Sequence, residues 1–362
     1  MQIPHLSLTN FRSYKQLDLE LEGGNSIFIG ENGEGKTNIV ESIIYLSLLE
    51  SHRVSNDQPL ISLGEERAYV RARTKSDERE LLVELEINPH RANRAQINKQ
   101  PVRSQREILG LVNTTHFSPE DLDLVRGDPS ERRRYLDHLL IQESPRYSAV
   151  ISDYERAIKQ RNSLLKARAP RQSLEPWDQH ILDFGSEVVA GRLRLLKKLK
   201  PHLTDAYRSI STKKEFSVDY RSSTPDLSTD KEMNREALSL KLEEVREAER
   251  ERGVTLVGPH RDDLDLKLND NLVKGFASHG ESWSAALALK LSSYLLLQSE
   301  GKRPILILDD VFSELDQSRR EQLTDLAGKA DQTLITVAVS DDLPKNLTGN
   351  RFTVKEGRVV KQ

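Results

Sequence analysis

The amino-acid sequence predicts an α/β fold that is split along the chain by an inserted helical lobe. Near the start, Gly30–Thr37 is a complete G-x-x-x-x-G-K-T motif. About 270 residues downstream, the aliphatic run Ile305–Leu308 is followed directly by Asp309 and Asp310. Compact enzymes with this glycine-rich loop usually place the acidic strand much closer to the lysine. The wide spacing is typical of ABC-type P-loop ATPase heads, which enclose ATP between two copies.

The glycine-rich motif has the sequence context that phosphate binding requires. Residues 26–29 read as a short buried strand before it, and residues 38–49 read as a helix after it. The glycines let the backbone approach phosphate oxygens closely, and the helix N-terminus faces them. Lys36 is expected to reach the β- and γ-phosphates, and the Thr37 hydroxyl to bind Mg²⁺. The predicted ATP-binding residues are Gly30, Glu31, Asn32, Gly33, Glu34, Gly35, Lys36, Thr37 and Asn38.

The acidic strand supplies the other half of the predicted site. Four aliphatic residues in succession indicate a strand buried on both faces, as in the centre of a parallel sheet. Asp309 is expected to hold Mg²⁺, and Asp310 stands where a general base polarises the attacking water. Many sandwich ATPases have the longer glutamate at the second position. With Lys36 and Asp310 as the catalytic residues, we expect turnover below the ~10 s⁻¹ of a median enzyme.

A third element, Ser278-His-Gly-Glu, precedes an apolar-periodic stretch at residues 283–297. Alone, it is explained by a helix cap, with Ser278 as the N-cap and Glu281 closing a capping box. Its place before the acidic strand favours a signature segment whose hydroxyl and amides stabilise the γ-phosphate. These groups are expected to complete the ATP site of a second molecule in an ATP-dependent homodimer. The predicted in-trans residues are Ser278, Gly280, Glu281 and Asp316.

Composition limits the possible classes of protein. With 362 residues, the chain is long enough for two lobes, and the absence of cysteine excludes disulfides, thiol catalysis and cysteine-based zinc sites. We find neither a signal peptide nor an apolar run of membrane-spanning length, so we expect a cytoplasmic protein without a membrane partner. The net charge of −3 does not indicate nucleic acid, so any DNA contact must come from local basic patches.

One such patch is a basic helix in the insert, although most charge runs of this kind are solvated helix faces. Aromatic residues make up only 5% of the chain, which argues against a stacking platform for single strands and favours duplex phosphates. Other basic groups are Arg91, Arg94, Lys99, Arg103 and Arg106, and the run Arg132–Arg134. The residues predicted to contact DNA or couple it to ATP are Arg53, Arg192, Arg194, Lys197 and Lys198.

The order of strand and helix patterns predicts three segments: a head part at 1–115, a helical arm at 116–253 and a second head part at 254–362. The arm is interrupted by prolines and is too short for a long coiled coil. A single charged helix is expected at 233–252, and an edge strand at 3–8. Prolines expected to break the arm helices are Pro170, Pro176, Pro201 and Pro225. Further strands are expected at 16–21, 69–73, 81–87, 111–117, 255–258, 264–268 and 333–339.

Four sequence strings resemble the RecF family of bacterial recombination mediators, and the resemblance covers nearly the whole chain. They are Phe117–Gly127 followed by Arg132–Asp137, then Val257–Asp263, Asp309–Asp316 and Ser51–Arg53. The resemblance implies a head like those of SMC proteins without the long coiled coil. It also implies ATP-dependent dimerisation, binding of double-stranded DNA and single-strand/double-strand junctions, and slow DNA-stimulated hydrolysis. The implied partner is RecR, and the implied role is to help load RecA at gaps.

The resemblance also assigns roles to single residues. Arg12 and Ser13 are implied to contact the nucleotide, Asn32 to lie near the γ-phosphate, and Arg53 to couple DNA to ATP. The segment Thr336–Ser340 departs from related ATPases, which hold a histidine γ-phosphate sensor there, and Ser340 or Asp341 is left as its substitute. His260 and Arg261 belong to a turn that is either structural or functional.

Two other classes fit parts of the pattern. An architectural DNA clamp of the SMC type shares the head, but it needs sustained heptads that the proline-containing insert lacks. The ATPase subunit of a membrane transporter shares the nucleotide motifs, but it explains neither the basic arm nor the four family strings.

Overall fold

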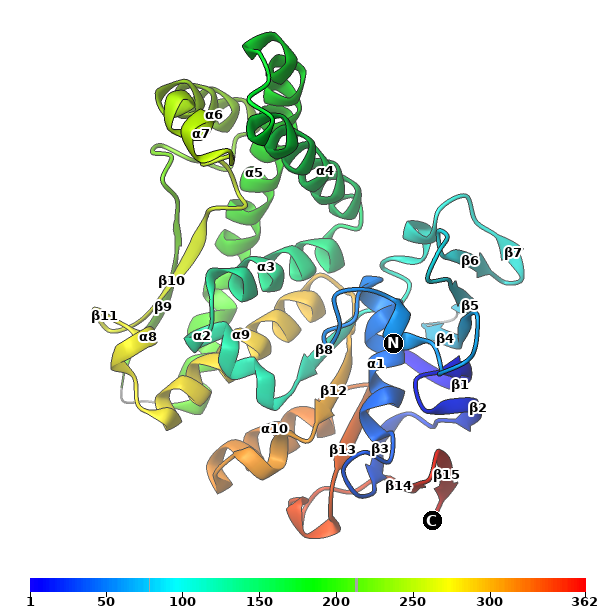
Figure 1. The fold of residues 1–362 in the computed structure, drawn as a ribbon. Helices are drawn as coiled ribbons and strands as arrows, with labels where there is room; N and C mark the ends of the chain where they lie inside the picture. Colours follow the sequence, from blue (N-terminus) through cyan, green and yellow to red (C-terminus); the bar gives the residue numbers. More distant parts are fainter. Residues whose placement is uncertain (78, 212–213) are drawn as a thin grey trace. The chain divides into compact units, whose positions relative to one another are not determined.

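The structure is a computed structural model that describes residues 1–77, 79–211 and 214–362. The chain forms two compact units, coloured along the sequence in Figure 1. Unit 1 contains Met1–Asp121, Arg208–Thr212 and Ala286–Gln362, and unit 2 contains Leu122–Tyr207 and Lys213–Ala285. Residues 254–285 therefore group with the helical insert, although the sequence prediction placed them in the second head part.

Unit 1 contains an antiparallel sheet of six strands in the order β2-β1-β4-β5-β6-β7. Alternating apolar residues such as Leu6 and Leu8 bury one face of β1. Since β1 pairs with both β2 and β4, the predicted edge position of residues 3–8 is wrong. The strands are β1 (Gln2–Phe11), β2 (Tyr14–Glu20), β4 (Ala68–Ser76), β5 (Arg79–Ile87), β6 (Arg94–Ile97) and β7 (Gln100–Pro101).

The second sheet of unit 1 has the order β15-β14-β3-β13-β12-β8 and is parallel except for β15. The strand before the glycine-rich loop, β3, and the acidic strand, β12, both pair with β13. Their carboxyl ends therefore open at the same edge of the sheet. The strands are β3 (Gly24–Ile29), β8 (Thr114–Phe117), β12 (Ile305–Asp309), β13 (Gln332–Val337), β14 (Asn350–Lys355) and β15 (Arg358–Lys361).

One apolar core joins both sheets to helix α1 (Lys36–Leu48). Ile39, Val40 and Ile43 of α1 are fully buried in this core, together with Ile307 of β12. The packing fixes the start of α1, and with it the glycine-rich loop, against the parallel sheet. Unit 1 also contains α10 (Gln317–Lys329) and the short helices η1 (Gln58–Leu60), η2 (Gln105–Ile108), η3 (Pro119–Asp121), η4 (Val311–Glu314) and η5 (Ser340–Asp342), and α9 (His279–Ser299) begins in unit 2 and ends in unit 1.

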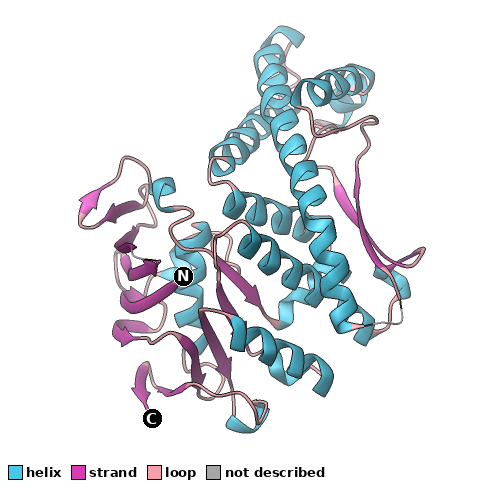
Figure 2. Cartoon of the chain, turned by 180° about the vertical axis from the view of Figure 1, so that it is seen from behind, coloured by secondary structure: helices cyan, strands magenta, loops and turns pink. Residues whose placement is uncertain are grey.

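Unit 2 is built mostly of helices, as Figure 2 shows. Its longest helix, α5, contains Pro176 and Pro201, so the predicted interruptions at these prolines are wrong. Pro176 is the sixth residue of the helix and removes the backbone hydrogen bond to the Gln172 carbonyl, yet the helix continues through it. Pro201 lies between Leu199 and Leu203, which are both buried. The helices are α2 (Leu122–Arg126), α3 (Pro129–Glu143), α4 (Tyr147–Lys166), α5 (Arg171–Ile210, which passes into unit 1 after Tyr207), α6 (Lys231–Glu244), α7 (Arg246–Arg252) and α8 (Val273–Phe276).

The predicted helix at 233–252 is divided at Val245 into α6 and α7. A three-stranded antiparallel sheet completes unit 2, in the order β11-β10-β9. Because β10 pairs with β9, residues 263–268 belong to this small sheet. In the part of the chain that the structure describes, no helix is both long and apolar enough to cross a membrane. The strands are β9 (Phe216–Arg221), β10 (Asp263–Leu268) and β11 (Asn271–Leu272).

Residues 255–258, predicted as a strand, form no strand but lead into a turn. Arg261 donates two hydrogen bonds to the Thr255 carbonyl, from Nε at 3.1 Å and Nη2 at 2.9 Å. His260 lies 3.2 Å from the same carbonyl through Nε2, and its Nδ1 lies 2.6 Å from the Tyr154 hydroxyl. The two residues left without a role by the sequence therefore hold this turn in place.

Candidate nucleotide-binding site

The glycine-rich loop between β3 and α1 is shaped by its own lysine. Nζ of the buried Lys36 donates hydrogen bonds to the carbonyls of Gly30 at 2.7 Å and Glu31 at 3.2 Å. Gly33 and Gly35 have φ angles of 92° and 107°, which side-chain-bearing residues rarely adopt. A Cβ on Gly30 would come within 2.2 Å of the Val354 carbonyl oxygen. The loop therefore requires glycine, and its amides and lysine form a cradle that fits a phosphate chain.

Thr37 and Asp309 meet across the fold, as the sequence motifs predicted. The Thr37 hydroxyl donates a hydrogen bond of 3.2 Å to Asp309 Oδ1, and the Thr336 hydroxyl donates to the same oxygen. Burial raises the pKa of Asp309 to about 6, although the Thr336 hydrogen bond opposes the shift. A hydroxyl and a carboxylate beside a phosphate cradle are the oxygen ligands that Mg²⁺ prefers. The site therefore fits Mg²⁺ held by Thr37 and Asp309.

Asp310 follows the acidic strand in a left-handed conformation, with φ of 50°. Its backbone N–H donates a hydrogen bond of 3.0 Å to the Thr336 hydroxyl, which anchors the turn to β13. Burial raises the pKa of its carboxyl, and the charge of Lys36 opposes this shift. The Asp310 carboxylate is therefore a stronger proton acceptor than a fully hydrated aspartate, as a general base needs. Ser340 and Asp341 of η5 are exposed and follow the same strand β13.

Glu41, which none of the sequence motifs singled out, lies at the centre of a polar network with Arg12, Ser51 and Arg53. Its carboxylate is fully buried and accepts hydrogen bonds from Arg12 and from Ser51, the latter at 2.6 Å. Arg53 lies 3.4 Å from the same carboxylate and donates to Asn38 at 3.1 Å. The sequence does contain a sign of this network, because a carboxylate within the apolar run of a buried helix needs a partner.

The guanidinium of Arg12, expected to contact the nucleotide, is therefore held by Glu41. Ser13 reaches the helix start indirectly, because Asn38 Nδ2 donates to its hydroxyl at 2.9 Å. Asn32 lies 3.5 Å from Lys36 Nζ through its side-chain oxygen. These contacts place Ser13, Asn32 and Asn38 at the loop, and Arg53 one hydrogen bond away from it.

The capping box predicted as one explanation of the signature segment is present. The Ser278 N–H donates to Glu281 Oε2 at 2.9 Å, and the Glu281 N–H donates to Ser278 Oγ at 3.3 Å. The side-chain hydrogen bond from Lys214 contributes most to lowering the pKa of Glu281 to about 2. Ser278, Gly280 and Glu281 thus form an ordered start of α9. Asp316 caps α10 by accepting from the Arg319 N–H at 3.1 Å.

The residues predicted to contact DNA differ sharply in their surroundings. Arg192 is buried and donates two hydrogen bonds of 2.8 Å to the Asp137 carboxylate, so it is a structural residue and not a phosphate contact. Arg194 donates to the Thr229 carbonyl at 2.7 Å, and Lys198 to Glu143 at 2.8 Å. Lys197 is exposed. Charge runs do not reveal such partners, which come from distant parts of the chain.

Comparisons with known proteins agree with this geometry. Residues 2–354 match the family described as the RecF/RecN/SMC N terminal domain. A "DNA replication and repair protein RecF" of Streptomyces avermitilis is 50% identical over 370 residues, covering 99% of each chain. A counterpart of the same name from Frankia alni is 46% identical over 376 residues, covering 100% of each chain.

Among solved structures, "the recombination mediator protein RecF-ATPrS in RecFOR pathway" is 30% identical, with a TM-score of 0.91 over 99% of this chain and 98% of that one. An SMC head bound to the C-terminal winged-helix domain of ScpA is 16% identical, with a TM-score of 0.57 over 100% and 98%, which shows a common fold. The fold is that of an ABC-type ATPase head without a long coiled coil. From its sequence and its structure alike, this chain belongs to the RecF family.

Proposed function

We propose that this protein is an ATP-dependent DNA-binding recombination mediator that acts in the repair of gaps in DNA. The observation that carries the proposal is the hydrogen bond between Thr37 and Asp309, which are 272 residues apart. It joins the helix after the phosphate cradle to the end of the acidic strand, and so assembles both halves of a nucleotide site. The names of the relatives, a DNA replication and repair protein and a recombination mediator, supply the process.

The residues of the cradle have separate tasks in ATP binding. The loop amides and Lys36 bind the phosphates, and Lys36 is already oriented by the two loop carbonyls. Thr37 and Asp309 hold Mg²⁺, which offsets the negative charge that develops on the phosphates. Asp310 accepts the proton of the attacking water. Its short side chain limits how closely it approaches, which is consistent with a slow ATPase used as a switch.

The in-trans half of the site is part of the proposal. Ser278 and Gly280 begin α9, whose first amides point toward negative charge in an ATP-bound homodimer. The homodimer binds double-stranded DNA, including single-strand/double-strand junctions, and releases it after hydrolysis. DNA stimulates the hydrolysis, and the protein acts in the cytoplasm with RecR to help load RecA. The 40 residues of α5 reach ~60 Å, which supports a short arm rather than an SMC-type tether.

The test combines light scattering after size exclusion with steady-state hydrolysis, each with and without ATP and duplex DNA. We expect ATP to shift the protein from monomer to dimer and DNA to raise the rate of hydrolysis. Lys36→Arg should bind ATP weakly and fail to hydrolyse it, because the longer planar group does not fit a position that is only 3% exposed. ATP turnover that ignores DNA, or a permanent monomer with ATP bound, contradicts the proposal.

A further inference from the structure

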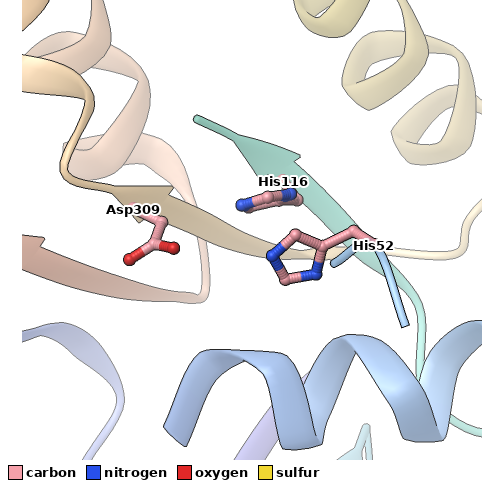
Figure 3. A group of neighbouring side chains, drawn as sticks. All are labelled: His52, His116 and Asp309. Carbon is pink, nitrogen blue, oxygen red and sulfur yellow. The ribbon is translucent and has the colours of Figure 1, made fainter. Parts of the chain in front are cut away.

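Two histidine rings lie beside Asp309 at the edge of the parallel sheet, and the proposed ATPase mechanism uses neither of them. His116 is on β8 and lies opposite Ile307 of β12 in parallel register. Side chains two residues apart on a strand share a face, so His116 and Asp309 face the same side of the sheet. His52 lies in the loop after α1, and its ring centroid is 4.6 Å from that of His116. Figure 3 shows the three side chains together.

The three side chains offer metal-ligating atoms in a small volume. One nitrogen of each ring and one oxygen of Asp309 all lie within 4.8 Å of one another. Two atoms bound to the same tetrahedral zinc ion are about 3.3 Å apart, because each bond is about 2.0–2.1 Å long. Rotations of the side chains that move the ligand atoms by about 1 Å close this difference. No other group of three such residues is found within residues 1–77, 79–211 and 214–362.

An unpartnered nitrogen that faces the site, on His116, is the second, independent observation that points to a ligand. His52 Nδ1 and His116 Nε2 are both buried, and neither has a hydrogen-bond partner in the described part of the chain. Buried polar atoms normally have partners, and leaving one without a partner costs folding free energy. A pair of purely structural histidines would be expected to hydrogen-bond at these atoms. A bound cation would occupy the lone pair of His116 Nε2, whereas His52 would bind it through Nε2, because Figure 3 shows His52 Nδ1 turned away from Asp309.

We propose that His52, His116 and Asp309 bind one divalent transition-metal ion, of which Zn²⁺ is the representative. Two imidazoles and one carboxylate suit zinc, iron or nickel, whereas Mg²⁺ prefers oxygen ligands alone. The site therefore selects a cation different from the one that accompanies ATP. Protein ligands fill three positions and leave at least one open, as in zinc sites that keep a water ligand.

The shared carboxylate gives this metal a regulatory role, and that role rests on the proposed ATPase function. Asp309 Oδ1 accepts the hydroxyl hydrogen bonds of Thr37 and Thr336. A transition metal bound by the two histidines draws the carboxylate away from Thr37 and weakens the Mg²⁺ site. Zinc thus slows ATP hydrolysis in this protein by competing for one ligand, without entering the phosphate cradle.

The binding test uses the full chain without nucleotide, so it does not depend on ATPase activity. Zn²⁺ is titrated in competition with a chromophoric chelator, and Co²⁺ reports histidine coordination by its visible absorption. We expect one Zn²⁺ per chain. His52→Asn and His116→Leu should each weaken binding more than about 100-fold, beyond the 10–100-fold lost when an outer hydrogen-bond partner of a metal ligand is removed. The matched control is His90→Asn, an exposed histidine of the same unit, which should bind zinc as the wild type does.

Zinc affinity that is unchanged in both histidine variants overturns the metal site. Leucine fills much of the space of His116, and the thermal midpoint of each variant shows whether it has folded. If His116→Leu does not fold, His52→Asn, which changes a loop residue, decides the matter. The experiment thus distinguishes lost ligands from lost structure.

A second measurement separates the regulatory role from the site itself. Hydrolysis of Mg²⁺–ATP is measured with and without Zn²⁺, and each variant is compared with its own zinc-free rate. We expect zinc to lower the rate of the wild type and of His90→Asn, but not that of the two metal-site variants. Equal inhibition of all four proteins overturns the regulatory role and assigns it to displacement of Mg²⁺ at the phosphates. A wild type without any ATPase activity overturns the proposed function, while the nucleotide-free titration still decides the metal site.

Discussion

Arg12 binds both carboxylate oxygens of Glu41, through Nε at 2.8 Å and Nη2 at 2.6 Å. The pair connects the turn after β1 to the middle of α1, the helix that begins at the phosphate cradle. Glu41 is fully buried, and Ser51 and Arg53 contact the same carboxylate from the loop after α1. The helix that presents Lys36 and Thr37 is therefore held from two directions by one acidic residue.

Glu41→Gln should lower the free energy of unfolding by about 3–5 kcal/mol, the usual cost of removing one partner of a buried ion pair. The amide keeps the shape of the side chain but leaves the Arg12 guanidinium, whose side chain is only 14% exposed, without a counter-charge. Chemical denaturation measures the change. Glu66→Gln is the matched control, since that side chain is 91% exposed beside Arg67 and should cost less than about 1 kcal/mol. If both variants lose the same free energy of unfolding, the buried ion pair of Glu41 contributes no more than an exposed one.

Acid should weaken the same network. Burial raises the pKa of Glu41, but hydrogen bonds from Arg12 and Ser51 and the arginine charges outweigh it, so its pKa lies below the ordinary 4.5. A lowered pKa means that the carboxylate stabilises the fold at pH values above 4.5 and loses this contribution as the pH falls through the folded-state pKa. The stability difference between wild type and Glu41→Gln, measured by denaturation, should therefore be constant near neutral pH and shrink below about 4.5. A stability difference between the two proteins that grows as the pH falls would contradict this prediction.

The sequence was sufficient for the cradle because its signal is local and its chemistry is restrictive. Glycine is needed where φ is positive, as at Gly33 and Gly35, and a lysine directly after such a loop is typical of phosphate binding. The contact between Thr37 and Asp309 was also predictable, since the two motifs supply two ligands that are expected to bind the same Mg²⁺ ion. The partner of Arg12 was not, because a buried ion pair depends on which residues the packing brings together.

The dependence of ion pairs on packing also explains why the basic residues of α5 could not be assigned from the sequence. Arg192 and Lys197 look alike in the sequence, yet one is buried against Asp137 and the other is exposed. Helical periodicity gives the spacing of a face, but it does not show which face a neighbouring element covers. The predicted breaks at Pro176 and Pro201 were wrong for a related reason. Proline disfavours a helix interior locally, but the helix continues through both residues, so this local preference does not decide where the helix ends.

Arg192→Ala and Lys197→Ala should therefore affect different properties. Removing Arg192 leaves the Asp137 carboxylate without its partner and should lower the free energy of unfolding by about 3–5 kcal/mol. Removing Lys197 should leave stability unchanged. If Lys197 neutralises one DNA phosphate, its loss reduces the slope of log affinity against log salt by about 0.9. Duplex binding measured over a series of salt concentrations gives the slope, and an unchanged slope would remove Lys197 from the DNA-contacting surface.

Ser278 has two separable roles, and a pair of substitutions distinguishes them. The residue closes a capping box at the start of α9, so Ser278→Ala should lower stability by about 1 kcal/mol. The backbone amides of the helix start remain in this variant, so ATP should still drive dimerisation. Ser278→Arg places a large cation at the surface that is proposed to cover the ATP of the second copy. It should bind ATP as a monomer yet neither dimerise nor hydrolyse.

Light scattering with ATP, together with nucleotide binding under the same conditions, reads out both variants. The alanine variant is the control for the lost cap, because any defect that it shares with the arginine variant comes from the capping box alone. If Ser278→Arg still dimerises with ATP, the start of α9 does not lie at the interface between copies. The capping box would then be the whole explanation of the segment, and the missing half of the site would have to come from elsewhere in the chain.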